Sequence, residues 1–322
     1  MSSPGRVVLA GQGRWARALA EGLARYAGLS AEVAAFDRGS DALSLSRWGA
    51  VHSADTLLLV GFRPGATTVR GRIFDATLAL ALAGRDTRII HYWIGTDVQR
   101  ALADTAAGHG DRLRRAISGR EHFAGSEPLA RDLGTLGIGA RVVPFPWEGV
   151  PSPDRLPAMP ERFTVLSYVP DARPEFYGGP ELVAAARALP DARFVVMGGA
   201  GAWVEDAPAN LEFAGWVADT AGLYADASCV VRLTEYDSIG GTAVEGLAWG
   251  RPVIYSHELA HATFVPFRDA PALIGALKAL AQRHAAGTFE PDADASAWAR
   301  REFDPATRFS ALAGALADGA ER

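Results

Sequence analysis

The chain has 322 residues, of which 49% are hydrophobic and 21% are charged, and its formal net charge is -5. This length exceeds what one hydrophobic core usually serves, so we expect two domains of roughly 150 residues each. The acidic balance argues against nucleic-acid binding, which needs clustered positive charge. The single cysteine, Cys229, excludes an intrachain disulfide and suits a reducing compartment.

The apolar runs of the chain are all short. The first spans five residues, from Val7 to Gly11, which is too few for the core of a secretory signal. No run approaches the ~18 residues that a membrane helix needs. We therefore expect a cytoplasmic protein that is at most peripheral to a membrane.

The first 150 residues alternate short apolar runs with segments of helical periodicity. Strands are predicted at 6–10, 32–36, 56–60 and 88–92. Helices are predicted at 15–26, 75–83 and 97–107. Alternation of this kind predicts a parallel sheet covered by helices.

A proline-rich segment from 143 to 160 interrupts this pattern, and because proline disfavours helices and sheet ladders it predicts an interdomain linker. The pattern then restarts, with strands predicted at 163–168, 193–197, 211–214, 229–233 and 252–255. Helices are predicted in this half at 180–189, 218–225, 242–249, 270–284 and 305–317. Two successive Rossmann-like halves are the simplest α/β architecture, with ligands bound at the carboxyl ends of the strands in the cleft between them.

The strongest functional signal is a polar loop followed by a helix start. The loop carries Asp237, and the pair Gly240 and Gly241 then opens a helix near Thr242. Free N–H groups and the positive end of the helix dipole suit such a turn to a diphosphate. One turn into the helix, Glu245 could accept hydrogen bonds from ribose hydroxyls, and Asp237 could bind sugar hydroxyls.

The same residues also have a purely structural interpretation. The segment from Thr242 to Glu245 matches a capping box, in which the glutamate satisfies N–H groups at the helix start. Spacing alone does not separate the two interpretations.

A resemblance favours the functional interpretation. The pattern Asp237-x7-Glu245, followed by Gly-Leu-Ala-Trp-Gly-Arg-Pro-Val-Ile, resembles the E-x7-E signature of retaining glycosyltransferase family four. Residues 210–217 and 223–228 are similar to the segments that lead into this signature, and 124–133 resembles the end of the family's N-terminal domain.

The resemblance implies a GT-B fold, in which two Rossmann-like domains place their parallel sheets on either side of a cleft. The acceptor domain is then expected over 1–150 and the donor domain over 151–296. The closing segment, about 297–322 with Trp298 and Phe303, is expected to cross back and pack on the first domain.

The resemblance also implies roles for the residues of the signature. Glu245 is expected to bind the nucleotide ribose, Asp237 to contact the transferred sugar, and Gly240, Gly241 and Thr242 to present N–H groups to the diphosphate. The implied reaction moves a sugar from a nucleotide diphosphate donor to an acceptor, with retention of configuration and with no metal or cofactor. The acceptor stays open between a glycan, a lipid-linked glycan, a small molecule and a protein, and a nucleotide-sugar-binding pseudoenzyme is a further alternative.

The sequence departs from the family pattern at two positions. Its first acid, Asp237, is one methylene shorter than glutamate, and Tyr177 stands where the family usually has a lysine. Arg173 and, second, Arg232 are candidates for the positive charge that neutralises the diphosphate. An ordinary surface arginine is the alternative for each.

The first half contains a glycine pattern with two interpretations. Gly11, Gly13 and Ala16 follow the first strand, with Asp37 at the end of the second, as in a dinucleotide-binding fingerprint. This makes an NAD-dependent oxidoreductase the competing function. In a GT-B protein the same glycines would let the donor or the acceptor approach the chain closely.

The strand at 88–92 precedes a second polar segment. His91 and Asp97 are predicted to face the cleft at the carboxyl end of this strand, as acceptor-side catalytic residues. An ordinary helix cap formed by Thr96 or Asp97 is the alternative.

Two further patterns are given less functional weight. Residues 112–120 form a basic amphipathic patch, which predicts a solvated face or, alternatively, peripheral contact with a membrane. His257 and His261 complete an H-E-x-x-H sequence that binds zinc when it is helical. Because the sequence follows a strand directly and Pro266 limits any helix, we expect no metal site there.

Overall fold

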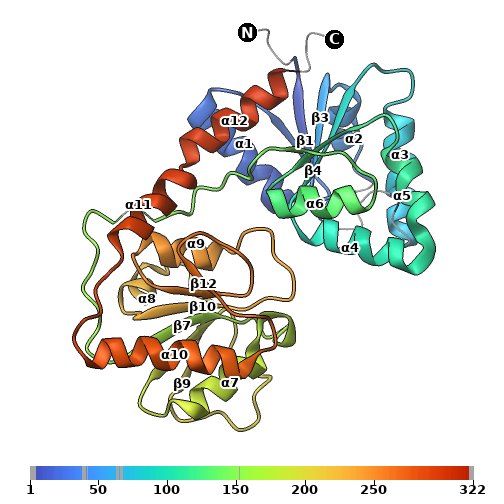
Figure 1. Cartoon of the computed structure of the whole chain (residues 1–322). Coiled ribbons are helices and arrows are strands. Elements are labelled where there is room, and N and C mark those ends of the chain that lie inside the picture. The colour runs from blue at the N-terminus through green and yellow to red at the C-terminus, as the bar shows by residue number, and fades with distance from the viewer. Residues whose placement is uncertain are drawn as a thin grey trace. The chain divides into compact units, whose positions relative to one another are not determined.

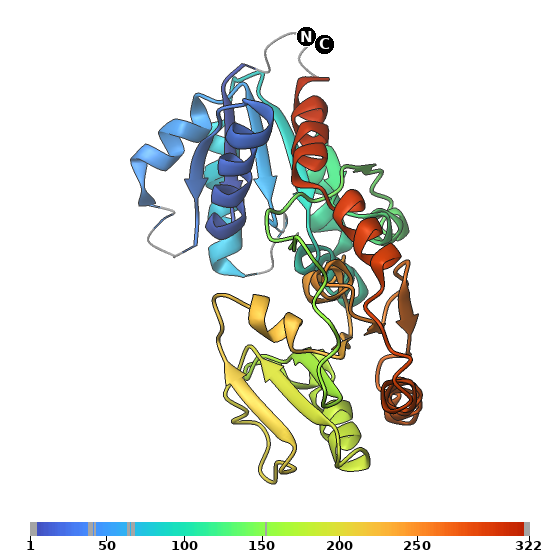
Figure 2. The same cartoon turned by 90° about the vertical axis from the view of Figure 1, so that its left-hand side faces the viewer.

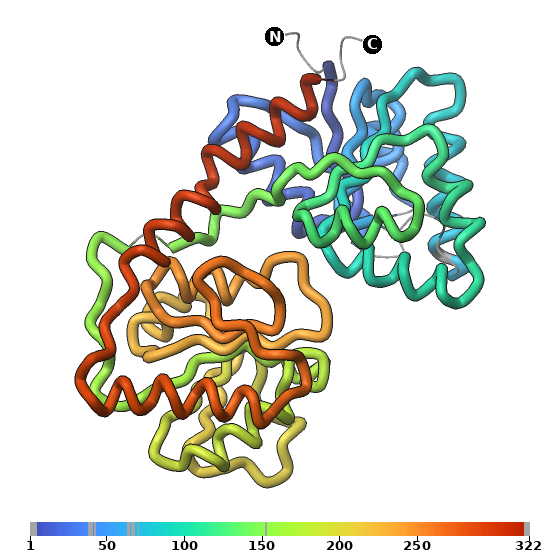
Figure 3. The backbone as a smooth tube through the Cα atoms, viewed as in Figure 1, coloured from blue at the N-terminus to red at the C-terminus, as the bar shows by residue number. Residues whose placement is uncertain are grey.

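The structure is a computed structural model that describes residues 5–37, 41, 43–62, 65, 68–151 and 153–318. It divides into two compact units (Figure 1). Unit 1 comprises Met1–Glu148 and Asp304–Arg322, and unit 2 comprises Gly149–Phe303. The chain therefore leaves unit 1 once and returns to it once, along the green and red parts of the tube in Figure 3.

Unit 1 is built on a parallel sheet with the strand order β2-β1-β3-β4-β5-β6. Its strands are β1 (Val7–Gly11), β2 (Glu32–Ala35), β3 (Thr56–Val60), β4 (Arg88–Trp93), β5 (Glu121–Ala124) and β6 (Arg141–Val142). Its helices are α1 (Gly13–Ala27), α2 (Leu45–His52), α3 (Val69–Ala81), α4 (Thr96–Asp104), the π-helix η2 (Thr105–His109), α5 (Gly110–Ile117), α6 (Glu127–Thr135) and α12 (Pro305–Ala317). Every residue of β1 and β3 is buried, as expected where helices cover both faces of a parallel sheet.

The last helix, α12, completes the core of unit 1. It packs along α1, as Figure 2 also shows. Phe309 of α12 stacks on Tyr26 with ring centroids 5.4 Å apart, and its ring fills the space above Gly22, where a Cβ atom would clash. Strand β1 and helices α1 and α12 therefore share one hydrophobic core.

Unit 2 repeats the architecture with the strand order β12-β11-β10-β7-β8-β9, again parallel throughout. Its strands are β7 (Thr164–Tyr168), β8 (Arg193–Met197), β9 (Leu211–Gly215), β10 (Cys229–Arg232), β11 (Val253–Tyr255) and β12 (Ala262–Phe264). Its helices are the 3-10 helix η3 (Glu175–Tyr177), α7 (Gly179–Ala188), α8 (Ala221–Ala225), α9 (Gly241–Ala248), α10 (Ala270–Ala285) and α11 (Ala293–Glu302). Residues of α7 and α10 contribute to one apolar cluster on the sheet, and residues of α9 and α11 to the other.

The predicted α/β fold of two Rossmann-like halves is confirmed. The structure adds elements that the sequence did not predict, among them β6 and β12, which are too short to show a period, and α2. Helix α3 begins at Val69, earlier than predicted, because the Thr68 hydroxyl accepts the Gly71 N–H and caps it. Within the described parts of the chain, no helix has both the length and the apolar character to span a membrane.

The structure corrects the prediction for the closing segment, 297–322. Helix α11 packs on α9 inside unit 2, where Trp298 joins the core and stacks edge-on against Phe303. The return to unit 1 begins only at Asp304, whose carboxylate accepts the Thr307 N–H and starts α12. One closing helix, not the whole segment, therefore packs on the first unit, and residues 319–322 lie outside the described chain.

Candidate functional site

The predicted loop and helix start lie at the centre of the unit 2 sheet. Strand β10 lies between β7 and β11, so the loop that follows it emerges at the carboxyl ends of three neighbouring strands. Helix α9 begins at Gly241 at the end of this loop. In open parallel sheets, ligands bind at the carboxyl ends of the strands.

An ion pair forms the base of the loop. Both Nε and Nη2 of Arg232 donate to Oδ2 of Asp237, at 3.1 and 2.9 Å, and the Ser238 N–H donates to Oδ1 at 3.0 Å. The two charged side chains are only 11% and 14% exposed. The Arg232 guanidinium also lies over the rings of Tyr177 and Tyr168, 5.1 and 5.8 Å from their centroids.

The electrostatics of this pair favour its charged form. Burial acts to lower the pKa of Arg232, but the carboxylate of Asp237, together with Tyr255 and Tyr177, raises it, and the net effect is a raised pKa. Arg232 therefore carries a fixed positive charge beside the predicted sugar-binding acid. Tyr177, at the position of the missing lysine, provides a ring surface for this arginine.

Glu245 lies in the second turn of α9 and binds a tyrosine. Its Oε2 accepts the hydroxyl of Tyr224 at 2.6 Å. Burial raises the pKa of Glu245, while the bond from Tyr224 and the charge of Arg232 act to lower it. The N-cap of α9 is Gly240, which has no side chain, and Thr242 is already inside the helix. The capping-box interpretation is therefore wrong.

Some of the N–H groups at the start of α9 already have an acceptor, and others do not. The Gly240 N–H donates to the hydroxyl of Tyr255 at 3.0 Å, so it is not free for a ligand as predicted. The N–H groups of Ala243 and Val244 turn back to the Gly240 carbonyl. Within the described chain, the N–H groups of Gly241 and Thr242 have no acceptor. The predicted anion site therefore rests on two N–H groups rather than three.

The other predicted cation, Arg173, lies on the loop after β7. Its side chain is exposed, and its guanidinium lies 3.8 Å from the ring centroid of Phe176. The Phe176 carbonyl in turn accepts the N–H of Glu235 at 3.0 Å, which joins this loop to the one after β10. Both predicted arginines thus lie at the carboxyl ends of the strands of this sheet. Arg173 is exposed on the loop after β7, whereas Arg232 is largely buried at the end of β10.

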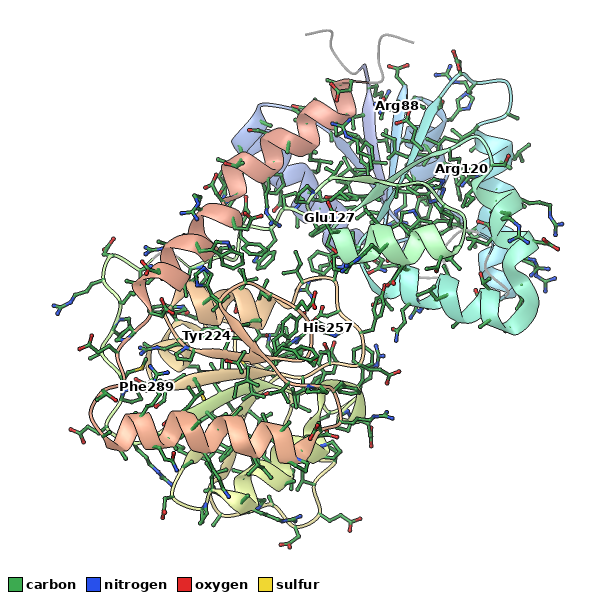
Figure 4. All side chains as sticks on the ribbon, viewed as in Figure 1. Arg88, Arg120, Glu127, Tyr224, His257 and Phe289 are labelled. Atoms are coloured by element: carbon green, nitrogen blue, oxygen red, sulfur yellow. The ribbon has the colours of Figure 1, made fainter. Side chains whose placement is uncertain are left out.

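The H-E-x-x-H sequence is not helical. It forms the turn between β11 and β12, and His261 has a positive φ of 64°. His257 Nε2 lies 3.1 Å from the carbonyl oxygen of Thr234, whereas the His261 ring lies 5.3 Å from that of Trp298 (His257 is labelled in Figure 4). The zinc-protease interpretation fails because the two imidazoles contact different elements. No three His, Cys, Asp or Glu side chains in the described residues gather as a metal site would require.

The glycines of the unit 1 pattern are in close contact with neighbouring parts of unit 1. Gly11 has φ 122°, and a Cβ atom there would lie 2.4 Å from the carbonyl oxygen of Val60. The Gly13 N–H donates to Oδ1 of Asp37 at 2.7 Å, and Arg17 lies 3.4 Å from Oδ2. Asp37, the acid that would bind the ribose of NAD, thus already bonds two residues of the first turns of α1.

His91 is not placed as predicted. It lies inside β4, its residue is 1% exposed, and the Arg120 guanidinium donates to its Nε2 at 2.8 Å. Burial lowers the pKa of His91, with smaller contributions from Arg120 and His122, so the ring is neutral. The predicted position of His91 at the carboxyl end of the strand is wrong, because the strand continues to Trp93 and its residues from His91 on are buried.

Asp97 is also enclosed. Its carboxylate accepts the N–H groups of Ile94, Gly95 and Val98 at 2.8 to 3.2 Å, and it is 3% exposed. Burial raises its pKa to about 6, against these backbone hydrogen bonds. Asp97 therefore holds the β4–α4 loop in place. This structural role is close to the helix-cap alternative, but the N-cap residue itself is Gly95.

Two residues of the unit 2 site were not predicted from the sequence. Tyr224 and Tyr255 come from α8 and β11, and each bonds a residue of the predicted site. Tyr224 lies in the segment 223–228 that carries part of the resemblance, but sequence alone does not show where its hydroxyl points. In the sequence, Tyr255 cannot be distinguished from the apolar residues of the buried strand that it ends.

Comparisons with known proteins give one match to a family model. Residues 180–283 match the family model described as "Glycosyl transferases group 1". The segment spans α7 to α10 and contains the whole β10–α9 loop. A search of curated protein sequences finds no match.

Solved structures resemble the chain over nearly its whole length. Anabaena HepE in complex with UDP-glucose aligns with a TM-score of 0.69 at 12% identity, covering 98% of this chain and 100% of that one. Sucrose-phosphate synthase from Thermosynechococcus elongatus aligns with a TM-score of 0.65 at 15% identity, covering 97% and 98%. A glycosyltransferase from Rickettsia africae aligns with a TM-score of 0.67 at 12% identity, also covering 97% and 98%.

These likenesses, with the two parallel-sheet units, define the fold as GT-B. The group 1 segment within unit 2 then gives the class of enzyme: the protein is a glycosyltransferase.

Proposed function

We propose that the protein moves a sugar from a nucleotide diphosphate donor to an acceptor, and that unit 2 binds the donor. The observation that carries this proposal is the pair of acids at one helix start. Asp237 and Glu245 flank the N-terminus of α9, and both lie inside the segment that matches group 1 glycosyl transferases. A carboxylate pair around free N–H groups suits a ligand with both hydroxyls and phosphates.

The proposed contacts follow from the chemistry of each group. The N–H groups of Gly241 and Thr242, at the positive end of the helix, bind the diphosphate. Glu245 accepts the ribose hydroxyls, and Asp237 accepts hydroxyls of the transferred sugar. Arg232 supplies a buried positive charge close to both acids.

A uridine nucleotide is the first donor to test. HepE was solved with UDP-glucose and also with UDP and glucose, which makes UDP the natural probe for a chain of the same fold. The transferred sugar and the acceptor stay open. Gly11 and Gly13 would let either substrate approach the chain closely in unit 1, and contact with a membrane surface through 112–120 is a further possibility to test.

Retention of configuration and independence from metal complete the proposal. The helix start and the arginine can stabilise a departing diphosphate without a cation, which supports metal independence. Activity that survives EDTA and a product with the donor's anomeric configuration are the expected results. Activity that returns only when a divalent cation is added would contradict metal independence.

A binding screen tests the donor proposal. Wild-type protein is heated with UDP, GDP, ADP, dTDP or NAD in large excess, and its melting temperature is recorded. A nucleoside diphosphate is expected to stabilise the protein by a few kcal/mol at ~100 times its Kd. A response to NAD alone would contradict the proposal and favour an oxidoreductase. Donor binding with no sugar released or transferred to any acceptor would favour a pseudoenzyme.

A further inference from the structure

A buried tyrosine lies beneath the proposed ribose-binding acid. The residue is Tyr224 of α8, which is 0% exposed and is labelled in Figure 4. Its hydroxyl donates to Oε2 of Glu245 at 2.6 Å, the short distance typical of a hydrogen bond to a carboxylate. Burial, and then the negative charge of Glu245, raise the pKa of Tyr224. The phenol therefore keeps its proton and acts as a donor.

The backbone of Tyr224 is held as firmly as its hydroxyl. Arg251, a completely buried arginine, donates from Nε to the Tyr224 carbonyl at 3.1 Å and from Nη2 to the Ala225 carbonyl at 2.8 Å. The same Nη2 reaches the carbonyls of Pro157 and Ala158 at 3.1 and 3.3 Å. Arg251 thus fastens the end of the short helix α8 to the chain that enters unit 2.

A continuous set of contacts therefore leads to the acid. Arg251 fixes the end of α8, α8 fixes the ring of Tyr224, and the Tyr224 hydroxyl fixes one oxygen of Glu245. The Thr242 side chain also hydrogen-bonds Tyr224. With one carboxylate oxygen held by the phenol, the other is the one left to accept a hydroxyl from a ligand.

We propose that Tyr224 is a positioning residue of the donor site, which holds Glu245 ionised and oriented toward the ribose hydroxyls of the donor. This inference rests on the proposed donor site, and its test separates the two. Tyr224 makes no contact with the ligand in this account. It acts through Glu245 alone.

The test compares two tyrosine-to-phenylalanine variants. Tyr224→Phe removes the hydroxyl beneath Glu245. Tyr92→Phe is the matched control, because Tyr92 is equally buried in unit 1 and its hydroxyl donates to the Val143 carbonyl at 2.8 Å. Each variant loses the hydrogen bonding of one buried hydroxyl and keeps the ring. UDP affinity is measured by calorimetry for both variants and for the wild type between pH 5 and pH 8.

The expected result is a loss of affinity confined to Tyr224→Phe. Its Kd for UDP should rise at least about tenfold at pH 7, because a carboxylate that loses a charged hydrogen bond is less well placed and less ionised. The Kd of Tyr92→Phe should stay within about twofold of the wild type.

The pH profile provides a readout that a packing role would not change. Two ionisable groups face Glu245, Tyr224 from α8 and Arg232 from β10. The hydroxyl of Tyr255, from β11, is taken by the Gly240 N–H. Helix α11 packs on α9 through residues that do not titrate, Ala295, Ser296 and Ala299. Binding requires the ionised carboxylate, so affinity falls as the pH falls through the pKa of Glu245. Because the Tyr224 bond lowers this pKa, Tyr224→Phe should lose affinity at a higher pH than the wild type. The phosphate of UDP titrates alike in all three proteins.

Two results would overturn the inference in different ways. If Tyr224→Phe binds UDP like Tyr92→Phe, with an unchanged pH profile, Tyr224 only packs and the donor site stands without it. If wild-type protein binds none of UDP, GDP, ADP and dTDP, the proposed donor site fails and the inference fails with it. If another of these diphosphates binds more tightly than UDP, the same comparison is made with that nucleotide.

Discussion

The polar residues around the end of β4 in unit 1 and after β10 in unit 2 look alike in sequence but not in the structure. His91 and Asp97 are buried, and their hydrogen bonds go to an arginine and to backbone N–H groups. Asp237 and Glu245 are instead partly accessible, beside a helix start where two N–H groups have no acceptor among the residues that the structure describes. A polar residue near a strand end thus forms a binding site only where the structure leaves some of its hydrogen-bonding capacity unused.

The largest expected effect tests the tight loop of unit 1. Gly11→Ala places a Cβ atom 2.4 Å from the Val60 carbonyl oxygen at φ 122°, a conformation that alanine rarely adopts. We expect a loss of more than about 3 kcal/mol in the free energy of unfolding, or failure to fold. Urea denaturation measures the loss.

The matched change in unit 2 should behave differently. Gly240→Ala places its Cβ 3.1 Å from Oδ2 of Asp237, at an ordinary φ of -70°. Stability should fall by about 1 kcal/mol or less, while affinity for the nucleotide falls because the ion pair with Arg232 must shift. If both variants lose stability equally, the loop after β10 is as rigidly structural as the loop after β1.

A pH-dependent effect of intermediate size distinguishes the buried acid of unit 1. Burial raises the pKa of Asp97 from 3.8 to about 6. Between these two pH values the folded state therefore holds a proton that the unfolded state has released. The stabilisation that this proton provides is complete below about pH 4 and is lost as the pH rises through about 6, an amount of order 3 kcal/mol. Asp97→Asn should abolish this part of the pH dependence. Urea denaturation of wild type and variant at pH 4, 5, 6 and 7 checks it, and parallel curves would contradict the assignment.

The smallest expected effect concerns the exposed arginine. Arg173→Ala removes a surface side chain whose described contact is the ring of Phe176. Stability should change by about 0.5 kcal/mol at most, and UDP affinity by less than about tenfold, since a solvent-exposed charge is screened. A larger loss of affinity would make Arg173, not Arg232, the main cation for the diphosphate.

Sequence reasoning succeeded where the pattern is local. Alternating apolar runs and helical periods identified the two parallel sheets, because each buried strand must be apolar on both faces. The glycine pair Gly240 and Gly241 predicted the start of α9, because a helix start depends on a few adjacent residues. The resemblance carried by Asp237 and Glu245 then pointed to the segment that matches a glycosyltransferase family.

Sequence reasoning failed where the answer depends on a distant partner. Nothing near His91 shows that Arg120 will bind it, and nothing near Gly240 shows that the Tyr255 hydroxyl will take its N–H. The same applies to Trp298, which packs inside unit 2 because α11 lies on α9. These contacts are set by tertiary packing, and the linear pattern of residues does not contain them.

The role of Glu245 is the central claim, and one measurement tests it most directly. UDP affinity and melting temperature are measured for the wild type, for Glu245→Gln and for the control Glu205→Gln, whose side chain is exposed on a loop of unit 2. The account predicts that Glu245→Gln binds UDP at least about tenfold more weakly, with little change in melting temperature, while Glu205→Gln matches the wild type. Unchanged UDP affinity, together with a lowered melting temperature for Glu245→Gln, would show that the glutamate only stabilises the fold and would contradict the account.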